Sequence, residues 1–330
     1  MTIRFPLSHA RRGVLCAGAA LALLAAGAAP AWAQAYPNKP LKFVVPFSAG
    51  SATDAVGRIV AQAMGEALGQ AITVDNKAGA NGILGAEAVK AAPGDGYTFL
   101  VTTSTTQAAN VSLYKKLSYD PVKDFTPIGK IGETGFILMV QNDFPAKDMK
   151  EFIAYAKSHP GKLAYGHGSS GSLVSAAMLG QMAGLEVLSV PYKSIPPALT
   201  DLLGGQLQFA FADVGNAASQ MNGGRLRGLG VTTAKRASRA PQVPPIGDTV
   251  KDYAVGAWFG LMAPANLPAD VKAKVGTAFA TAMARPDVRE KIVAAGIDVD
   301  YQDSAQLAKT IASEIQKWAL WVKAANITPE

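Results

Sequence analysis

Cysteine and histidine are scarce in this sequence of 330 residues, which contains one cysteine and three histidines. The cysteine, Cys16, lies inside an N-terminal apolar run, so disulfide and thiol chemistry are excluded from the rest of the chain. A single histidine in a candidate loop, with no cysteine and no pair of carboxylates at ligand spacing, does not make a metal site. The sequence therefore predicts no metal, no cofactor and a fold that depends on its apolar core.

Acidic residues are absent before Asp54, and the N-terminal segment has the composition of a signal peptide. Its apolar run, 14–29, is almost wholly Ala, Leu, Gly and Val, and the small-x-small site Ala31-Trp32-Ala33 follows. The charged residues that precede this run are Arg4, Arg11 and Arg12. We expect cleavage near Ala33 and export to the periplasm, by the general or the twin-arginine route, because the apolar run is short for a membrane span. A retained N-terminal anchor is the alternative.

A strong excess of charge is also missing. Without residues 1–33 the chain keeps 28 of its 31 basic side chains against 24 acidic ones, over 297 residues. The largest basic cluster is Lys235-Arg236 with Arg239, and no aromatic residues interleave with it. We therefore predict no nucleic-acid partner and a solvated, slightly basic surface that helps to attract acidic solutes.

Short apolar runs alternate with helical patterns along the chain, which predicts open α/β sheets with helices on both faces. The pattern restarts after 136–140, so we expect two such units. The expected strands are 41–45, 72–74, 97–101, 136–140, 163–165, 187–190, 207–212, 228–231 and 257–262. The expected helices are 55–68, 83–91, 149–158, 173–183, 196–203, 269–284 and 304–325, the last with a Trp/Leu stripe that should pack against the first unit.

The loop Phe47–Asp54 is the first candidate binding element. It follows a buried strand that Pro46 ends, and it leads through small polar residues into a helix that Thr53 or Asp54 should cap. Free backbone N–H groups and the positive end of a helix dipole would together hold an anion there, at the carboxyl end of a strand. An ordinary βα turn is the alternative.

Two further polar segments follow strands. Thr102–Thr106 should open a second loop on the same sheet edge, although simple linker polarity explains it equally well. Gly166–Ser172 repeats the arrangement of strand, small polar loop and helix start, so the loops of the two units could face each other.

The sequence lacks the common catalytic motifs. Gly50-Ser51-Ala52-Thr53 lacks the lysine of a phosphate-binding Walker loop, and neither Ser169 nor Ser170 fits the G-x-S-x-G pattern. A base for these serines would have to be His159, which we expect at the surface, or His167, which is too near in sequence to be the usual distal partner. An exported hydrolase that uses the Ser169/Ser170 loop is therefore the weaker reading, and binding fits better than turnover.

Ordered landmarks give the chain a resemblance to a known family. They are YPNKP (36–40), VVPFSAGSATD (44–54), DNKAGANGILGAE (75–87), PGDGYT (93–98), YDPVKDFTPIG (119–129), PGKLAYGHGSSGS (160–172), VPYKS (190–194), ALTDLLGGQLQFAF (198–211), GGRLRGLGVTTAKR (223–236) and WFGLMAP (258–264). Over nearly all of the chain after residue 33, the sequence resembles the periplasmic solute receptors of tripartite tricarboxylate transporters, the Bug-type binding proteins.

The resemblance implies the two-domain type II binding-protein fold, with domain 1 formed by 34–136 and 254–330 and domain 2 by 137–253. A small carboxylate, a di- or tricarboxylate or an aromatic acid, would be enclosed between the domains. Loop 47–54 would hold one carboxylate, Ser169 and Ser170 the other end, and Tyr192-Lys193-Ser194 and Asp213 would offer further contacts. The expected ligand-binding residues are Phe47, Ser48, Ala49, Thr53, Asp54, Thr103, Ser104, His167, Ser169, Ser170, Tyr192 and Asp213.

The family also implies a monomer without enzymatic activity that delivers its ligand to membrane subunits of a tripartite transporter, or to a sensor kinase. The chain departs from the family pattern at Ser51, where a glycine is usual, at Leu173-Val174, and at Val111, where proline is common. These changes touch the expected pocket and suit an aromatic or branched acid at least as well as citrate. A cationic or neutral ligand, with Asp54 and Asp213 as its charge partners, is a further alternative.

Overall fold

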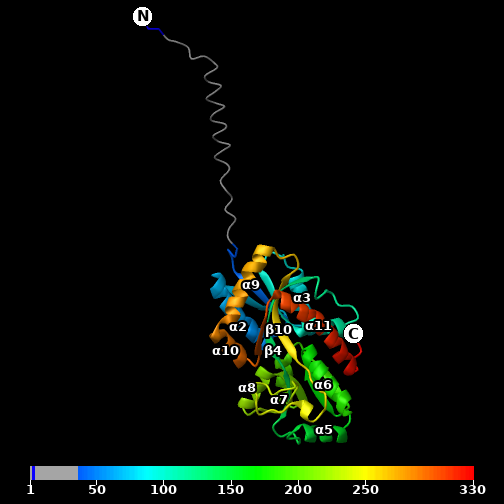
Figure 1. Ribbon diagram of the computed structural model, residues 1–330. Coiled ribbons are helices and arrows are strands. Elements are labelled where there is room, and N and C mark those ends of the chain that lie inside the picture. The colour runs from blue at the N-terminus through cyan, green and yellow to red at the C-terminus, as the bar shows by residue number, and fades with distance from the viewer. Residues whose placement is uncertain (1, 4–35) are drawn as a thin grey trace. The chain divides into compact units, whose positions relative to one another are not determined.

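Two β-sheets organise residues 39–330 (Figure 1). The computed structural model describes residues 2–3 and 36–330, so the predicted signal peptide, apart from Thr2 and Ile3, lies outside the described residues. Within the described part of the chain, no helix combines the length and apolarity that crossing a bilayer requires.

The first sheet has six strands in the order β11-β4-β10-β3-β1-β2. β1 runs parallel to β2 and β3, whereas β10 is antiparallel to both β3 and β4, so the sheet is mixed. Its strands are β1 (Leu41–Val45), β2 (Ile72–Asn76), β3 (Thr98–Thr103), β4 (Phe125–Thr134), β10 (Ala257–Pro264) and β11 (Asp298–Gln302). Its helices are α2 (Ala52–Leu68), η1 (Ala80–Gly82), α3 (Ile83–Lys90), η2 (Thr105–Ala109), α4 (Asn110–Leu113), α9 (Ala269–Ala284), α10 (Pro286–Ala294) and α11 (Ser304–Ala324).

The second sheet has five strands in the order β7-β6-β8-β5-β9, and β5 is antiparallel to both of its neighbours. Its strands are β5 (Phe136–Gln141), β6 (Leu163–His167), β7 (Val187–Pro191), β8 (Phe209–Asp213) and β9 (Leu226–Val231). Its helices are α5 (Met149–Ser158), α6 (Ser170–Ala183), α7 (Ile195–Leu203), α8 (Val214–Asn222) and the short η3 (Ile246–Asp248). We call the two sheets with these helices the first and second lobes.

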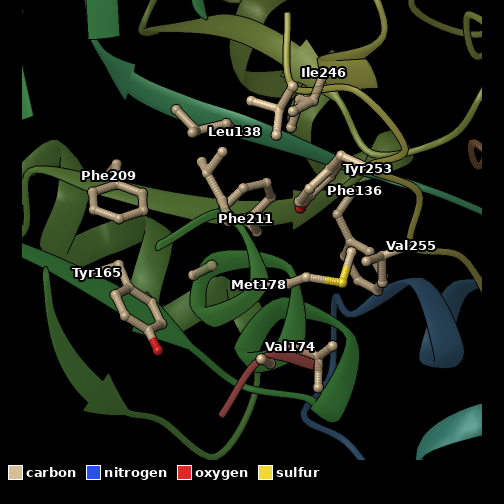
Figure 2. Packing of buried hydrophobic residues seen from close by; sticks show 14 of the residues in the cluster. Phe136, Leu138, Tyr165, Val174, Met178, Phe209, Phe211, Ile246, Tyr253 and Val255 are labelled. Atoms are coloured by element: carbon tan, nitrogen blue, oxygen red, sulfur yellow. The ribbon is translucent and has the colours of Figure 1, made fainter. Parts of the chain in front are cut away.

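The core of the second lobe shows why these runs become strands. One face of the second sheet carries Phe136 and Leu138 of β5 and Phe209 and Phe211 of β8, because every second side chain of a strand points to the same face. Figure 2 shows these side chains packed with those of α6. The rings of Phe209 and Tyr165 lie 5.4 Å apart between centroids. Each such buried aromatic side chain contributes roughly 1.5–3 kcal/mol, so this cluster holds β5, β6 and β8 in one rigid lobe.

The chain crosses between the lobes at two glycines. β4 ends at Thr134 and β5 begins at Phe136, so the first crossing is Gly135. On the return, the Val255 N–H still donates to the Thr232 carbonyl of the second lobe, and β10 begins at Ala257, so the second crossing is Gly256. The predicted domain bounds of 34–136 with 254–330, and 137–253, stay a prediction.

Helix α11 corrects one prediction. Leu307 and Ile311 in its first half belong to the core of the first lobe, whereas Trp318 and Val322 join the cluster that contains the core of the second sheet. The helix also packs on α6 of the second lobe. The tryptophan stripe therefore packs into the core as expected, but α11 lies against both lobes rather than the first alone.

Candidate functional site

A small cavity lies where the two lobes meet at the carboxyl ends of β1, β3, β6 and β8. Its volume is about 30 Å³. The residues that line this cleft cavity are Phe47, Ser51, Thr53, Thr103, Thr105, Thr134, Phe136, Gly168, Ser169, Ser194, Ile195, Asp213, Ala257 and Phe259. They come from both lobes, and Thr134, Phe136 and Ala257 lie directly beside the two crossings, so any change in the angle between the lobes changes this cavity.

Four helices begin at the cleft cavity, which sets its electrostatics. Ser51, Ser169, Ser194 and Asp213 occupy the N-cap positions of α2, α6, α7 and α8, and each of them lines the cavity. The first turn of a helix has backbone N–H groups without helical acceptors, and the helix dipole places partial positive charge there. Four such ends around one cavity make a site for an anion such as a carboxylate.

The start of α2 is ordered by a network around Asp54. The hydroxyl of Ser51 accepts from the Asp54 N–H at 3.2 Å, so Ser51 is the cap, and the prediction of Thr53 or Asp54 in that role is wrong. The Asp54 carboxylate accepts from the Gly50 N–H at 3.0 Å and from Asn76 Nδ2 at 2.9 Å, and it forms an ion pair with Arg58 at 3.0 Å. Asp54 therefore serves the loop rather than the cavity.

The pKa of Asp54 agrees with this role. Burial alone would raise the pKa, but the hydrogen bonds from Arg58, from the Gly50 N–H and from Asn76 outweigh it and hold the pKa below its ordinary value. The carboxylate is thus ionised and already paired, which leaves it no free charge for a cationic ligand.

The start of α6 is fixed by a capping box. The Ser169 hydroxyl accepts from the Ser172 N–H at 3.3 Å, and the Ser172 hydroxyl accepts from the N–H groups of Ser169 and Gly168, each at 3.1 Å. Gly168 must be glycine, because a Cβ there would lie 2.1 Å from the carbonyl carbon of Ser194. This close approach brings the beginnings of α6 and α7 to one point of the cavity.

Ser194 has an unused hydroxyl at the cavity. Its side chain is 1% exposed, its Oγ has no hydrogen-bond partner, and it does not cap α7 although it occupies the N-cap position. A buried hydroxyl left without a partner costs roughly 1–3 kcal/mol, so it is stabilised by a ligand that accepts its proton. Ser194 thus has the properties of a ligand-contacting residue.

Asp213 is the one carboxyl group of the cavity lining. Asn216 Nδ2 donates to its Oδ2 at 2.5 Å, and burial raises the pKa of Asp213 despite that hydrogen bond. A carboxyl group with a raised pKa takes up a proton more readily and can then donate it to an acceptor on a ligand.

Beside the cavity, a polar bridge joins the lobes. Asn81 Nδ2 on the first lobe donates to Ser170 Oγ on the second at 2.6 Å, and that hydroxyl donates to Asn110 Oδ1 of the first lobe at 3.2 Å. Ser170 and Asn110 are both fully buried. Ser170, predicted to bind ligand, thus contacts the other lobe and does not line the cleft cavity.

The structure brings some of the predicted site residues together and separates others. Those that line the cleft cavity are Phe47, Thr53, Thr103, Ser169 and Asp213. Those that do not are Ser48, Ala49, Asp54, Ser104, His167, Ser170 and Tyr192.

The separated residues have other surroundings. Thr103 ends β3 and Ser104 leads directly into the π-helical η2, so the expected loop after β3 is helical, and Ser104 is fully buried. His167 and Tyr192 line a different cavity of about 400 Å³ near the C-terminus. Burial lowers the pKa of His167 to about 4, and the Tyr192 hydroxyl donates to Asp201 at 2.6 Å.

Nine lining residues are not among the twelve expected ligand-binding residues: Ser51, Thr105, Thr134, Phe136, Gly168, Ser194, Ile195, Ala257 and Phe259. Of these, Ser194 was expected only as a further contact of the segment 192–194, and Ser51 only as part of loop 47–54. Ser194 carries a recognisable signal, since a serine directly before an Ile-Pro-Pro helix start is a typical N-cap. Thr134, Phe136, Ala257 and Phe259 belong to the crossings, and nothing local in the sequence marks them.

Metal chemistry finds no support in the described residues, since no group of three or more His, Cys, Asp or Glu side chains in residues 36–330 could hold a metal ion. No hydrogen bond joins His167 to Ser169 or Ser170 in this part of the chain, so a nucleophile–base pair is not formed there.

Comparison with known proteins gives a consistent result. The family model described as "Tripartite tricarboxylate transporter family receptor" matches residues 56–327. A protein of Pseudomonas sp. strain P51, described as "UPF0065 protein in tcbD-tcbE intergenic region", is 33% identical over 312 residues, which cover 93% of this chain and 92% of that protein. "Protein BugT" of Bordetella pertussis is 29% identical over 88% of this chain and 91% of its own.

Solved structures agree with these relatives. "R. palustris Rpa4515 with adipate" superposes with a TM-score of 0.86 at 30% identity, over 89% of this chain and 100% of that one. The periplasmic binding protein BugD gives 0.85 at 31% identity, over 89% and 100% of the chains. "MatC (Rpa3494) from Rhodopseudomonas palustris with bound malate" gives 0.81 at 32% identity, over 87% and 100%.

Proposed function

Because the chain belongs to the tripartite tricarboxylate transporter receptor family, we propose that it binds a small carboxylate in the cleft cavity and delivers it to membrane subunits of such a transporter. The observation that carries the proposal is the meeting of four helix N-termini at one cavity, with the unpaired hydroxyl of Ser194 among them. Backbone amides and hydroxyls at such a site match a carboxylate, and they match it without an arginine clamp.

The lining also favours an acid with an apolar middle. Phe47, Phe136 and Phe259 stand among the polar groups of the cavity. The related structures named above contain adipate and malate, both dicarboxylates. We therefore propose a dicarboxylate with a methylene chain, or an aromatic acid, in preference to citrate, whose third carboxylate would meet these rings.

Binding requires the lobes to separate first. A cavity of about 30 Å³ has room for roughly one or two water molecules and not for a dicarboxylic acid. The polar bridge of Asn81, Ser170 and Asn110 closes this side of the cleft. We infer that rotation about Gly135 and Gly256 opens the cleft, and that the ligand is then enclosed as the lobes return.

We propose a receptor without turnover. The Ser169 hydroxyl caps α6, the Ser170 hydroxyl bridges the lobes, and His167 lines a different cavity, which argues against the hydrolase alternative. Prolonged incubation with a bound acid tests this: the acid should be recovered unchanged, and formation of a product would establish an enzyme instead.

A cationic or neutral ligand is less consistent with the site. Asp54 is already paired with Arg58, so Asp213 is the only acidic side chain in the cavity lining. The predicted signal segment further supports a periplasmic location and a transporter partner, with a sensor kinase as the alternative recipient and a monomer as the expected state. Cell fractionation and copurification with membrane subunits test these expectations.

A thermal-shift screen tests the function directly. Dicarboxylates of increasing chain length, aromatic acids, tricarboxylates and diamines are compared, and a ligand at a hundredfold excess over its Kd should add about 2.7 kcal/mol of stability. We expect dicarboxylates or aromatic acids to raise the Tm. A response to diamines alone would contradict the proposal.

The Ser194→Ala variant gives the residue-level test. Loss of a hydrogen bond to a charged acceptor should weaken carboxylate binding by about tenfold or more. The Tm of the ligand-free protein should stay the same or rise, because Ser194 caps nothing and its buried hydroxyl has no partner there. Ser175→Ala is the matched control, since Ser175 is equally buried, has an equally unpaired hydroxyl and lies outside the cavity lining. Equal affinities of the two variants would show that Ser194 does not contact the ligand.

A further inference from the structure

A larger cavity lies on the opposite face of the two crossings. We call it the rear cavity; its volume is about 170 Å³. Its lining includes Glu133 and Gly135 at the first crossing and Gly256 and Trp258 at the second. It also includes segment 233–239 of the second lobe and, from the first lobe, Asp298 and Lys317.

Strand alternation separates the rear cavity from the cleft cavity. Successive side chains of a strand point to opposite faces, and Thr134 pairs with Ala257 across the two crossings. Phe136 and Phe259 line the cleft cavity, whereas the intervening Trp258 and the residue Glu133 line the rear one. Thr134 and Ala257 line both cavities, so the two cavities lie back to back with these strand residues between them.

The acidic side chains of the rear cavity have partners, whereas most of its basic side chains form no salt bridge. Glu133 pairs with Lys130, Glu314 with Lys317, and Asp298 accepts from the Ser238 hydroxyl. The remaining basic side chains of the cavity are Lys235, Arg236 and Arg239. In residues 36–330 none of these three forms a salt bridge, and Arg236 donates to the Pro241 carbonyl at 2.8 Å.

Three unpaired cations on five consecutive residues repel one another unless something neutralises them. Their loop lines a cavity that is several times larger than the cleft cavity and that is open to solvent. Of the nearby acidic side chains, Glu133 and Glu314 are already in ion pairs, and Asp298 supplies one negative charge against three positive ones. The loop therefore keeps an excess of positive charge that an anion from outside the chain can neutralise. Ammonium and guanidinium donors gathered on one loop are suited to a compact anion with several oxygens, such as a phosphate.

We propose that the rear cavity is a second binding site, for a small oxyanion of the phosphate type, with Lys235, Arg236 and Arg239 as its main ligands. This site is distinct from the carboxylate site in the cleft, because no side chain that would hold the oxyanion lines the cleft cavity.

Trp258 supplies a reporter for the test. It lines the rear cavity, is 2% exposed, and its indole N–H has no hydrogen-bond partner. The full chain labelled with ¹⁵N-tryptophan has four indole N–H signals. The signal that disappears in Trp258→Phe is that of Trp258. Addition of inorganic phosphate or pyrophosphate, with chloride at the same ionic strength as the control, should shift the Trp258 signal saturably.

The Lys235→Gln/Arg239→Gln variant should weaken phosphate binding at least tenfold. The rise in Tm that a dicarboxylate produces should stay unchanged. Lys150→Gln/Lys157→Gln, which removes the same charge from exposed positions of α5, should change neither. A Trp258 signal unmoved by either anion, or equal losses in the two double variants, would overturn the proposal. Ser194→Ala keeps the two sites distinguishable, since it should weaken carboxylate binding and leave the phosphate response intact.

Discussion

Asp213 places a carboxyl group in a cavity whose other polar groups suit an anion. Burial raises its pKa, so its proton is taken up at a higher pH than for an ordinary aspartate. We expect carboxylate affinity to rise as the pH falls through that raised pKa, because a neutral Asp213 no longer repels the ligand and can donate to it. Asp213→Asn should bind more tightly than wild type at pH 7 to 8, by about tenfold, and should lose this pH dependence.

Calorimetric titrations across pH 4 to 8 give the measurement, and Asp143→Asn, an exposed carboxylate, is the control. If Asp213→Asn abolished binding at every pH, Asp213 would instead be contacting a cationic group of the ligand. That outcome would revive the cationic-ligand alternative, so the same variant separates the two ligand classes.

The loop 192–194 shows where residue-level prediction from sequence fails. The whole segment 192–194 was expected to offer contacts and Tyr192 was chosen as the ligand-binding residue, yet the Tyr192 hydroxyl donates to Asp201 and Ser194 lines the cavity. The decisive contact is the approach of Gly168 to the Ser194 backbone, which joins segments that are distant in sequence. Phe47, Thr53, Thr103, Ser169 and Asp213 were predictable because each lies close to the carboxyl end of a strand or to the start of a helix.

At the scale of elements, the start of α2 depends on Asp54 rather than on its cap alone. Asp54→Asn should destabilise the fold by about 1 kcal/mol at pH 7, because the ion pair with Arg58 is lost, and it should leave carboxylate binding in place. The pKa of Asp54 is held below its ordinary value, so the wild-type contribution is present at pH 7 and is lost as the pH falls below about 4.

Urea unfolding at pH 7 and at pH 3 measures this, and Asp75→Asn, which loses only an exposed ion pair with Lys77, is the control. The difference between Asp54→Asn and wild type should be clear at pH 7 and smaller at pH 3. A constant difference would mean that the side-chain charge plays no part in it.

Most elements followed from periodicity, and the exceptions have physical reasons. β4 was missed because Pro127, Gly129 and Gly132 interrupt its apolar pattern, although Gly129 and Gly132 are required: a Cβ would lie 2.4 Å from Phe279 or from the Asp298 carbonyl oxygen. β11 was missed because an exposed edge strand carries little apolar signal. The two-lobed α/β fold was predictable from the restart of the strand–helix pattern, and the comparisons confirm the family resemblance and the fold.

At the scale of the whole molecule, the back-to-back arrangement of the two cavities predicts coupling between them. Thr134 and Ala257, which lie beside the crossings at Gly135 and Gly256, line both cavities. We therefore expect a rotation about the crossings that widens the cleft cavity to narrow the rear cavity. The rear cavity is present while the polar bridge of Asn81, Ser170 and Asn110 is closed. An oxyanion in the rear cavity therefore resists opening and favours the closed form that encloses a carboxylate.

We expect saturating phosphate to tighten carboxylate binding by about fivefold or more, and the carboxylate to tighten phosphate binding by the same factor, since coupling between two sites is reciprocal. Calorimetric titration of each ligand with and without the other measures both factors. In Lys235→Gln/Arg239→Gln the coupling should disappear while the carboxylate still binds. Unequal factors would show that the two ligands compete at an additional site. If neither ligand changed the affinity of the other, the crossings would move without changing the rear cavity.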